Sequence, residues 1–280
     1  MNIFRSLLVR NEQDIIKQNL EFHKDKADGL IVTDNMSTDG TREILEDYMR
    51  AGIIDLIIDE KEQNYNQYLW TTRMTNIAKE VYNADYVYST DADEFWDIPN
   101  LDLFKRALGF FKLTNVFKCE YFNMLPEDNV DFLNFKYKIM NKPFESEQLS
   151  KAYNLFSYII DNPDNKYKAL YSTEGFIKNW QGNHSVDIQD KEELITHIDI
   201  LHYPVRSYEQ FLDKIIQGGQ AYERNTELPS GMGSHWKSLY SIYKEGNFES
   251  EYNKIIGKNL DLTELIQNGI IEEVESLRDL

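Results

Sequence analysis

The first ninety residues alternate between short apolar runs and amphipathic segments, and this alternation restricts the fold more than any other feature. The apolar runs, which are typical of strands, cover residues 2–9, 29–35, 53–59 and 85–90. Residues 11–24, 39–52 and 67–83, which lie between them, place apolar side chains at helical spacing. Strands joined through helices of this length run parallel and are covered on both faces. The sequence therefore predicts an α/β fold with a mainly parallel sheet flanked by helices.

The pattern changes after Asp97. Residues 101–112 are predicted to be a helix, residues 115–122 a strand, and residues 123–190 irregular apart from short strands at 135–140 and 167–173. From Ser207 the chain is predicted to be helical, and Ser207 with Gln210 forms a capping-box pattern. The segments 246–256 and 260–277 are predicted to be further short helices. We therefore expect a helical C-terminal extension over residues 207–280.

The charge balance limits the possible partners. The 30 Lys and Arg residues are outweighed by 48 Asp and Glu, for a formal net charge of −18. Since no basic stripe stands out, a nucleic-acid polymer is not expected as a partner, and contact with an anionic membrane is expected to be peripheral at most. A small phosphate-bearing ligand is compatible, because a metal ion or a helix N-terminus can receive it.

The single cysteine and the apolar content indicate the compartment. Cys119 has no partner for an internal disulfide, which favours a reducing compartment, and its strand-like surroundings predict a buried residue. No apolar run approaches the roughly 20 residues that span a bilayer. The N-terminal residues do not resemble a signal peptide. We therefore expect a cytoplasmic protein.

Three carboxylates follow the fourth apolar run, in the sequence "YVYSTDADEFWDIP". In open parallel α/β sheets, ligands bind at the carboxyl ends of the strands. In an extended chain, alternation would aim Asp91 and Asp93 to the same side. Two convergent carboxylates with little Lys or Arg nearby suit Mn²⁺ or Mg²⁺, which commonly adds substrate phosphate oxygens to its ligands. A solvated acidic turn is the alternative interpretation.

A second polar cluster, "VTDNMSTDGT", follows the second apolar run. Asp34 could accept hydrogen bonds from ribose hydroxyls or a base, as acidic residues beyond a strand do in nucleotide-binding folds. Ser37, Thr38 or Asp39 could cap the next helix. Because both clusters follow predicted parallel strands, we expect them to face one crevice.

Two histidines lie in aromatic surroundings, His184 in "WQGNHSV" and His202 in "ILHYPVRS". A lone histidine is more often structural than a ligand, and both interpretations stay open at this point. Arg73 and Arg206 are candidate phosphate partners, because a guanidinium matches phosphate oxygens geometrically. Either arginine could equally form a surface ion pair.

Four segments together resemble a known family. They are "VRNEQDIIKQNLEFH", "VTDNMSTDGT", "ADYVYSTDADEFW" and "LHYPVRSYEQF". In this order they look like a family 2-type glycosyltransferase of the GT-A fold, in the bacterial branch with a "DADEF" form of the D-x-D motif. The resemblance covers residues 5–100 most strongly and residues 180–215 less so.

The resemblance implies a nucleotide-sugar donor, most simply a UDP-sugar, and a divalent metal, Mn²⁺ or Mg²⁺. Carried over by position, the nucleoside and phosphate contacts would be Asn11, Glu12, Asp34, Arg73, Asn76 and Asp91. The metal ligands would be Asp91, Asp93 and His202. Arg73 is displaced from the family pattern, because "TRMTN" stands where the family has "ARN".

The family's usual Asp base, from an "ED" pair late in the domain, has no clean equivalent. Asp128 in "PEDN" comes early, and His184 is better placed but of a different residue type. The resemblance further implies a GT-A domain over residues 1–206. Its nucleotide-sugar half would cover residues 1–100, and its acceptor half residues 101–206.

The sequence thus predicts a metal-dependent glycosyltransferase of the hexosyltransferase type that transfers sugar to an acceptor hydroxyl, with inversion. The acceptor would be a glycan, glycoprotein or lipid-linked molecule in cell-surface biosynthesis. One alternative is a nucleotidyltransferase acting on sugar phosphates, although the loop "VRNEQD" lacks the glycines of such an enzyme. The other is a non-catalytic carbohydrate-binding protein, which would leave Asp91 and Asp93 without a purpose.

Overall fold

A computed structural model describes residues 1–62, 66–140, 166–224, 233–256 and 261–279. The chain forms two compact units, which are described separately. Unit 1 comprises residues 1–62, 66–121 and 167–200, and unit 2 comprises residues 63–65, 122–166 and 201–280, so far as they are described. The predicted division at residues 206 and 207 stays a prediction.

The strands of the N-terminal half pair in parallel, as predicted. These strands are β1 (Ile3–Val9), β2 (Gly29–Asp34), β3 (Leu56–Asp59) and β4 (Tyr86–Asp91). β1 lies between β2 and β4, and β3 pairs with the outer side of β2. Every residue of β1 and β2 is buried, as expected for strands covered on both faces. The α/β fold class is thereby confirmed.

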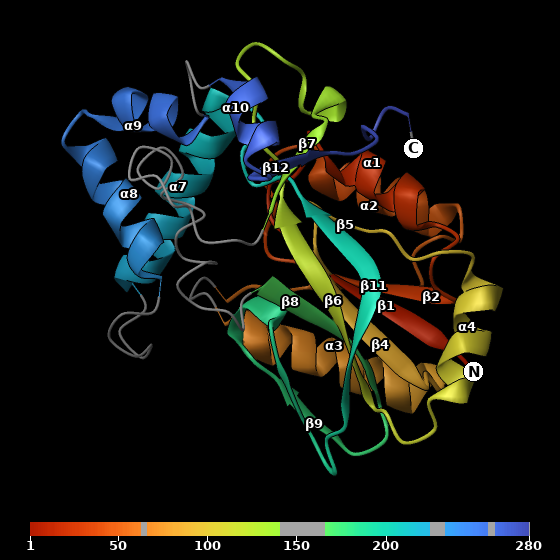
Figure 1. Cartoon of the computed structure of the whole chain (residues 1–280). Coiled ribbons are helices and arrows are strands. Elements are labelled where there is room, and N and C mark those ends of the chain that lie inside the picture. The colour runs from red at the N-terminus through yellow and green to blue at the C-terminus, as the bar shows by residue number, and fades with distance from the viewer. Residues whose placement is uncertain (63–65, 141–165, 225–232, 257–260, 280) are drawn as a thin grey trace. The chain divides into compact units, whose positions relative to one another are not determined.

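Three helices connect these strands. They are α1 (Ile16–His23), α2 (Thr41–Arg50) and α3 (Gln67–Tyr82). Figure 1 shows α1 and α2 on one side of β1 and β2 and α3 on the other, as right-handed crossovers require when the strand order reverses at β1. α3 ends at Asn83, whose left-handed conformation caps the helix.

The second half of the main sheet is antiparallel where it joins the first. The eight strands have the order β3-β2-β1-β4-β8-β6-β11-β5. β8 (Tyr167–Ser172) runs antiparallel to both β4 and β6 (Val116–Asn123). The remaining members are β5 (Glu94–Trp96) and β11 (Glu193–His202), and α4 (Leu101–Phe110) precedes β6. Cys119 on β6 is buried, as predicted, and burial raises the pKa of its thiol to about 12.

The region predicted to be irregular is more ordered than expected where it is described. β8 and β7 (Tyr137–Ile139) lie at the predicted positions, but β9 (Phe176–Asn179) and β10 (Val186–Ile188) add an unpredicted hairpin. The short run of three or four residues in each of these two strands gives too little alternation for a sequence pattern to detect. Residues 141–165 lie outside the described part of the chain.

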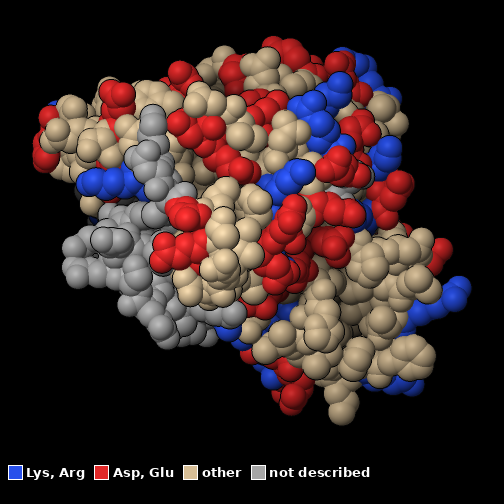
Figure 2. All heavy atoms as spheres, turned by 45° about the horizontal axis from the view of Figure 1, so that its top comes forward, with Lys and Arg blue, Asp and Glu red and all other residues tan. Residues whose placement is uncertain are grey.

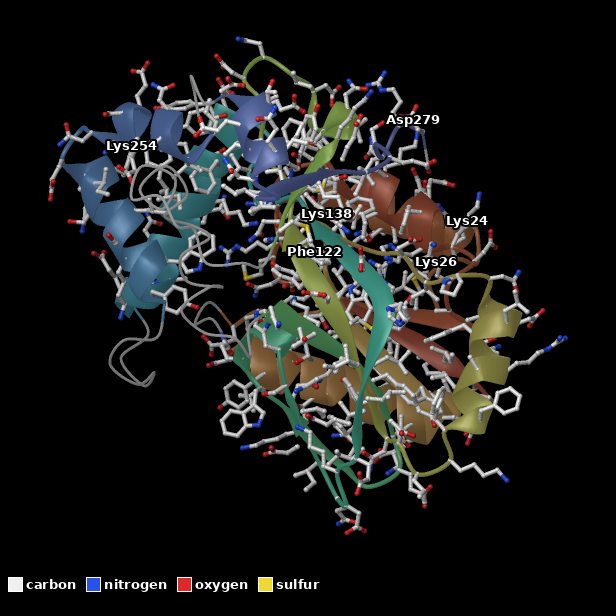
Figure 3. All side chains as sticks on the ribbon, viewed as in Figure 1. Lys24, Lys26, Phe122, Lys138, Lys254 and Asp279 are labelled. Carbon is white, nitrogen blue, oxygen red and sulfur yellow. The ribbon has the colours of Figure 1, made fainter. Side chains whose placement is uncertain are left out.

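Unit 2 is mainly helical after residue 207. Its helices are α7 (Tyr208–Arg224), α8 (Ser234–Lys244), α9 (Phe248–Ile255) and α10 (Leu262–Gln267). The helix predicted over residues 260–277 is wrong in its second half, because β12 (Ile271–Glu273) pairs with β7. Gly269, with φ of +64°, separates α10 from this strand. Figure 3 shows Phe122 and Lys138 of unit 2, whose side chains form a cation–π contact at 4.5 Å.

The capping-box prediction is correct in one half. Ser207 Oγ accepts a hydrogen bond from the Gln210 backbone N–H at 3.1 Å. Gln210 Oε1, however, accepts from the backbone N–H of Arg206 and not from that of Ser207. The chain entering α7 is therefore held one residue further back than the sequence pattern implies.

Acidic side chains are spread over the surface shown in Figure 2, where Lys and Arg lie among them. Within the described residues, no helix is long and apolar enough to cross a membrane.

Candidate active site

The two acidic clusters lie at the same edge of the parallel sheet. In the strand register, Asp34 of β2 is opposite Val9 and Asp91 of β4 is opposite Leu8. β1 separates the two carboxylates, so two strand spacings place their Cα atoms about 10 Å apart. This is the carboxyl edge of β1, β2 and β4, where open α/β sheets bind ligands.

The loop after β1 is bonded to the loop after β2. Asn11 has a left-handed backbone, with φ of +54°, and its Oδ1 accepts from the Thr38 backbone N–H at 2.7 Å. The Asn11 N–H donates to Ser37 Oγ at 3.0 Å, and the Glu12 N–H donates to Thr41 Oγ1 at 2.8 Å. Ser37 and Thr38 therefore join the two loops, which brings Asn11 and Glu12 beside the second cluster.

Asp39, which belongs to the same polar cluster, accepts a hydrogen bond at the start of α2. Asp39 Oδ1 accepts from the Thr41 backbone N–H at 2.9 Å, and Asp39 Oδ2 accepts from the Gln13 N–H at 3.1 Å. Of the three residues that could cap the helix, Asp39 is the one that bonds its first turn.

Asp34 is buried and already holds local structure. Its Oδ1 accepts from the Ser37 backbone N–H at 3.0 Å, and its Oδ2 lies 3.5 Å from the Arg42 guanidinium. Arg42 also pairs with Asp59 and Glu46. A carboxylate offers about four lone-pair positions, so Asp34 retains capacity to accept from a ligand.

The D-x-D segment is not extended, which corrects the predicted alternation. β4 ends at Asp91, residues 92 and 93 form a turn, and β5 begins at Glu94. Asn19 of α1 holds this turn, because its Nδ2 donates to the carbonyls of Ala92 at 2.8 Å and Glu94 at 2.9 Å. The side-chain directions of Asp91 and Asp93 are therefore set by a turn that α1 holds.

A buried polar network supports Asn19. Arg5 of β1 donates from Nε to Thr90 Oγ1 at 2.9 Å and from a guanidinium nitrogen to Asn19 Oδ1. His23 accepts from the Trp96 backbone N–H at 3.1 Å through Nε2, and its Nδ1 lies 2.8 Å from the Asn19 carbonyl. Burial, aided by Arg5, holds the pKa of His23 well below its usual value, so the neutral ring makes both contacts.

A lysine lies beside the D-x-D segment, which corrects the expectation that few cations are near it. Lys168 of β8 donates from Nζ to Asp91 Oδ2 at 3.1 Å and to Glu94 Oε1. Burial raises the pKa of Glu94 to about 8 although the Lys168 ammonium opposes this. Burial lowers the pKa of Lys168, but Asp91 and Glu94 outweigh it and raise the pKa above its ordinary value. The ammonium thus compensates part of the negative charge of the cluster.

Gln67 connects Asp91 to the turn that carries His184. Gln67 Nε2 donates to Asp91 Oδ1 at 2.9 Å, and its Oε1 accepts from the Gly182 backbone N–H at 2.8 Å. His184 is half-buried and lies edge-on to Tyr121, with ring centroids 5.8 Å apart. Its Nδ1 is 3.1 Å from the Tyr167 carbonyl, which makes Nδ1 the donor and Nε2 the basic nitrogen.

The other predicted site residues are carried by other elements. Arg73 and Asn76 are on α3, and Arg73 forms an ion pair with Glu60 at 2.9 Å. Asp128, His202 and Arg206 belong to unit 2. Asp128 is exposed in a turn, and His202 Nδ1 lies 2.6 Å from Asn123 Oδ1. Arg206 donates to the Tyr203 carbonyl at 3.1 Å.

Across the described ranges, no group of three or more His, Cys, Asp or Glu side chains lies close enough together to hold a metal ion. Asp91 and Asp93 are two carboxylates at one strand end, and Asp93 is almost fully buried. Mg²⁺ and Mn²⁺ are often held by one or two carboxylates with substrate phosphates and water, so this oxygen pair fits such an ion.

Sequence reasoning missed the residues that organise the cluster: Arg5, Asn19, Gln67 and Lys168. A weak signal was present for two of them. Arg5 interrupts an apolar run, and Lys168 interrupts the strand-like "YKALYS". A charged residue in a buried strand requires a partner, which points to a buried polar cluster without naming its members.

No family model matches this chain, and no curated protein matches it. Similar solved structures include S. aureus TarS residues 1–349, which is 12% identical with a TM-score of 0.43, over 95% of this chain and 77% of that chain. A second is the mannosyltransferase PcManGT from Pyrobaculum calidifontis in complex with GDP-Man and Mn²⁺. It is 13% identical with a TM-score of 0.41, over 96% of this chain and 79% of that chain.

Proposed function

We propose that this chain is a metal-dependent glycosyltransferase of the GT-A fold that transfers a sugar from a nucleotide-sugar donor to an acceptor hydroxyl. One observation carries the proposal. The "DNMSTDGT" and "DADEF" segments, which resemble family 2 motifs in kind and order, lie at one carboxyl edge of a parallel sheet with β1 between them. This edge is where such folds bind nucleotides.

Two ends of the donor would be bound by different segments. Asp34, with Asn11 and Glu12 on the loop bonded to it, would contact the nucleoside. Asp91 and Asp93 would hold the divalent ion, Mn²⁺ or Mg²⁺, which supplies positive charge for the diphosphate leaving group. Lys168 would hold the Asp91 carboxylate in place through its bond to Oδ2.

The base is assigned to His184, with Asp128 as the second candidate. The contact of Nδ1 with the Tyr167 carbonyl leaves Nε2 as the basic nitrogen, which is the form that accepts a proton from an acceptor hydroxyl. His202 has the same tautomer preference through Asn123, which suits its predicted role as a metal ligand through Nε2.

We also propose that the donor is a UDP-sugar, that the transferred group is a hexosyl group, and that transfer inverts the anomeric carbon. The acceptor is proposed to be a glycan, glycoprotein or lipid-linked molecule of cell-surface biosynthesis. Arg73 and Asn76 are proposed as further donor contacts from α3, and the compartment is proposed to be the cytoplasm.

Nucleotide binding and sugar transfer test the proposal in sequence. UDP, GDP and CDP would first be compared by calorimetry with and without Mn²⁺, and hydrolysis of the matching nucleotide sugars measured. Asp93→Asn should lose most activity and should require more Mn²⁺, because one charged ligand is gone. Asp47→Asn on α2, which changes an exposed carboxylate in the same way, is the matched control. Failure of the wild-type protein to bind any of these nucleotides would refute the function.

A further inference from the structure

The turn that follows β9 is tied to the D-x-D segment. It comprises Gln181, Gly182 and Asn183, and both Gly182 and Asn183 have left-handed backbones, with φ of +83° and +58°. The Gly182 N–H donates to Gln67 Oε1, and Gln67 Nε2 donates to Asp91 Oδ1, at 2.8 and 2.9 Å. Two hydrogen bonds therefore link this turn to the carboxylate proposed to act at the donor diphosphate.

Asn183 is buried and its amide makes no hydrogen bond. The residue is 6% exposed, and neither its Oδ1 nor its Nδ2 has a partner among the described residues. Gln181 Nε2 on the same turn is also buried without a partner, although Gln181 Oε1 accepts from the Tyr68 N–H. Buried polar groups are rarely left unpaired in folded proteins, because each loses its bonds to water. Unpaired donors and an acceptor on one turn are expected where a ligand supplies the partners.

The chemistry of the unpaired atoms selects the class of ligand. Asn183 presents an acceptor at Oδ1 and donors at Nδ2, both neutral. A phosphate or carboxylate would leave Oδ1 unpaired, a cation would leave Nδ2 unpaired, and an apolar group would leave both. A sugar hydroxyl donates and accepts at once, so two neighbouring hydroxyls or one hydroxyl and a ring oxygen satisfy the amide.

We propose that Asn183 is a specificity-determining residue that binds hydroxyl groups of the sugar on the donor, with Gln181 Nε2 as a further donor. This inference rests on the proposed function, because Gln67 links the turn that carries Asn183 to Asp91, the carboxylate proposed to act at the donor diphosphate. The nucleoside, which is assigned to Asp34, is recognised at a different strand end.

The test compares a nucleoside diphosphate with its sugar conjugates. Calorimetry would measure the dissociation constants of UDP against UDP-glucose, UDP-galactose and UDP-N-acetylglucosamine, and of GDP against GDP-mannose. In Asn183→Gly the best-bound nucleotide sugar should lose at least about tenfold in affinity. The dissociation constant of the free nucleoside diphosphate should stay unchanged.

Stability separates a ligand contact from a structural role. Glycine accepts the left-handed backbone of residue 183 and removes an amide that is unpaired in the free protein, but it also adds conformational freedom to the unfolded chain. Asn183→Gly should therefore lower the melting temperature no more than Asn83→Gly does. A structural asparagine would show the reverse. Asn83→Gly, an exposed asparagine with φ of +53°, is the matched control and should leave both affinities unchanged.

The outcomes distinguish the two proposals. An Asn183→Gly protein with an unchanged ratio of nucleotide-sugar to nucleoside-diphosphate affinity, or with a melting temperature below that of Asn83→Gly, would overturn the assignment of Asn183 and leave the proposed function standing. A wild-type protein that binds no nucleoside diphosphate would overturn both.

Discussion

Replacing Lys168 with methionine should destabilise unit 1 strongly. The side chain is 1% exposed and its ammonium contacts Asp91 and the fully buried Glu94, so water cannot replace it. Methionine has a similar length and fills most of the same space, which keeps the cavity contribution small. The change therefore isolates the loss of the buried charge.

The expected magnitude follows from the state of Glu94. Removing one partner of a buried ion pair costs about 3–5 kcal/mol of stability. Because burial already raises the pKa of Glu94 to about 8, this carboxyl can hold a proton at neutral pH, which limits the penalty. We expect a loss of about 3 kcal/mol for Lys168→Met and about 1 kcal/mol for Glu94→Gln, which keeps an acceptor. The double variant should lose at least about 1 kcal/mol less than the sum.

Urea unfolding at pH 7, followed by far-UV circular dichroism, measures these values for the wild type, both single variants and the double variant. Lys178→Met is the matched control, because Lys178 is 41% exposed and lies 3.7 Å from Asp187. It should change the free energy of unfolding by less than about 0.5 kcal/mol. A Lys168→Met protein within about 1 kcal/mol of wild type, or strictly additive losses in the double variant, would refute the reasoning.

Three further predictions concern pH, the nucleoside and unit 2. Burial and Arg5 keep the pKa of His23 well below 6.5, so only the unfolded chain takes up this proton. As the pH falls below 6.5, the contribution of His23 to the free energy of unfolding should therefore drop by about 1.4 kcal/mol per unit. A His23→Gln variant with the same pH dependence as wild type in urea titrations between pH 7 and 5 would contradict this. Asp34→Ala should weaken binding of the nucleoside diphosphate by about 1–3 kcal/mol. Equal dissociation constants for wild type and variant in calorimetry would remove Asp34 from the site. Asp59→Ala is the control, because Asp59 shares the contact to Arg42. In unit 2, a Cβ on Gly219 would lie 2.3 Å from Tyr240 Cγ. Thermal unfolding of Gly219→Ala should therefore show a loss of stability of about 1–3 kcal/mol. A Cβ on Gly109 would meet nothing within 4 Å, so Gly109→Ala should instead gain about 0.5–1 kcal/mol of stability.

The sequence by itself determined the fold class and the edge of the sheet where the polar clusters lie. Both depend on local patterns: short continuous apolar runs define the strands, period-3.6 spacing defines the helices, and alternation of the two requires parallel pairing. Asp34 and Asp91 end β2 and β4, as predicted. Where the local pattern was short it failed, as for the hairpin of β9 and β10 and for β12, because three or four residues carry too little periodicity.

Only the tertiary structure decided which side chains surround those carboxylates. Lys168 lies 77 residues after Asp91 in sequence, Asn19 lies 73 residues before Ala92, and Gly182 lies 115 residues after Gln67. No local pattern connects residues so far apart, because their contact depends on the order of strands in the sheet and on the turns between them. The same holds for the unpaired amide of Asn183: its residue type is visible in the sequence, but its burial without a partner is a property of the folded chain.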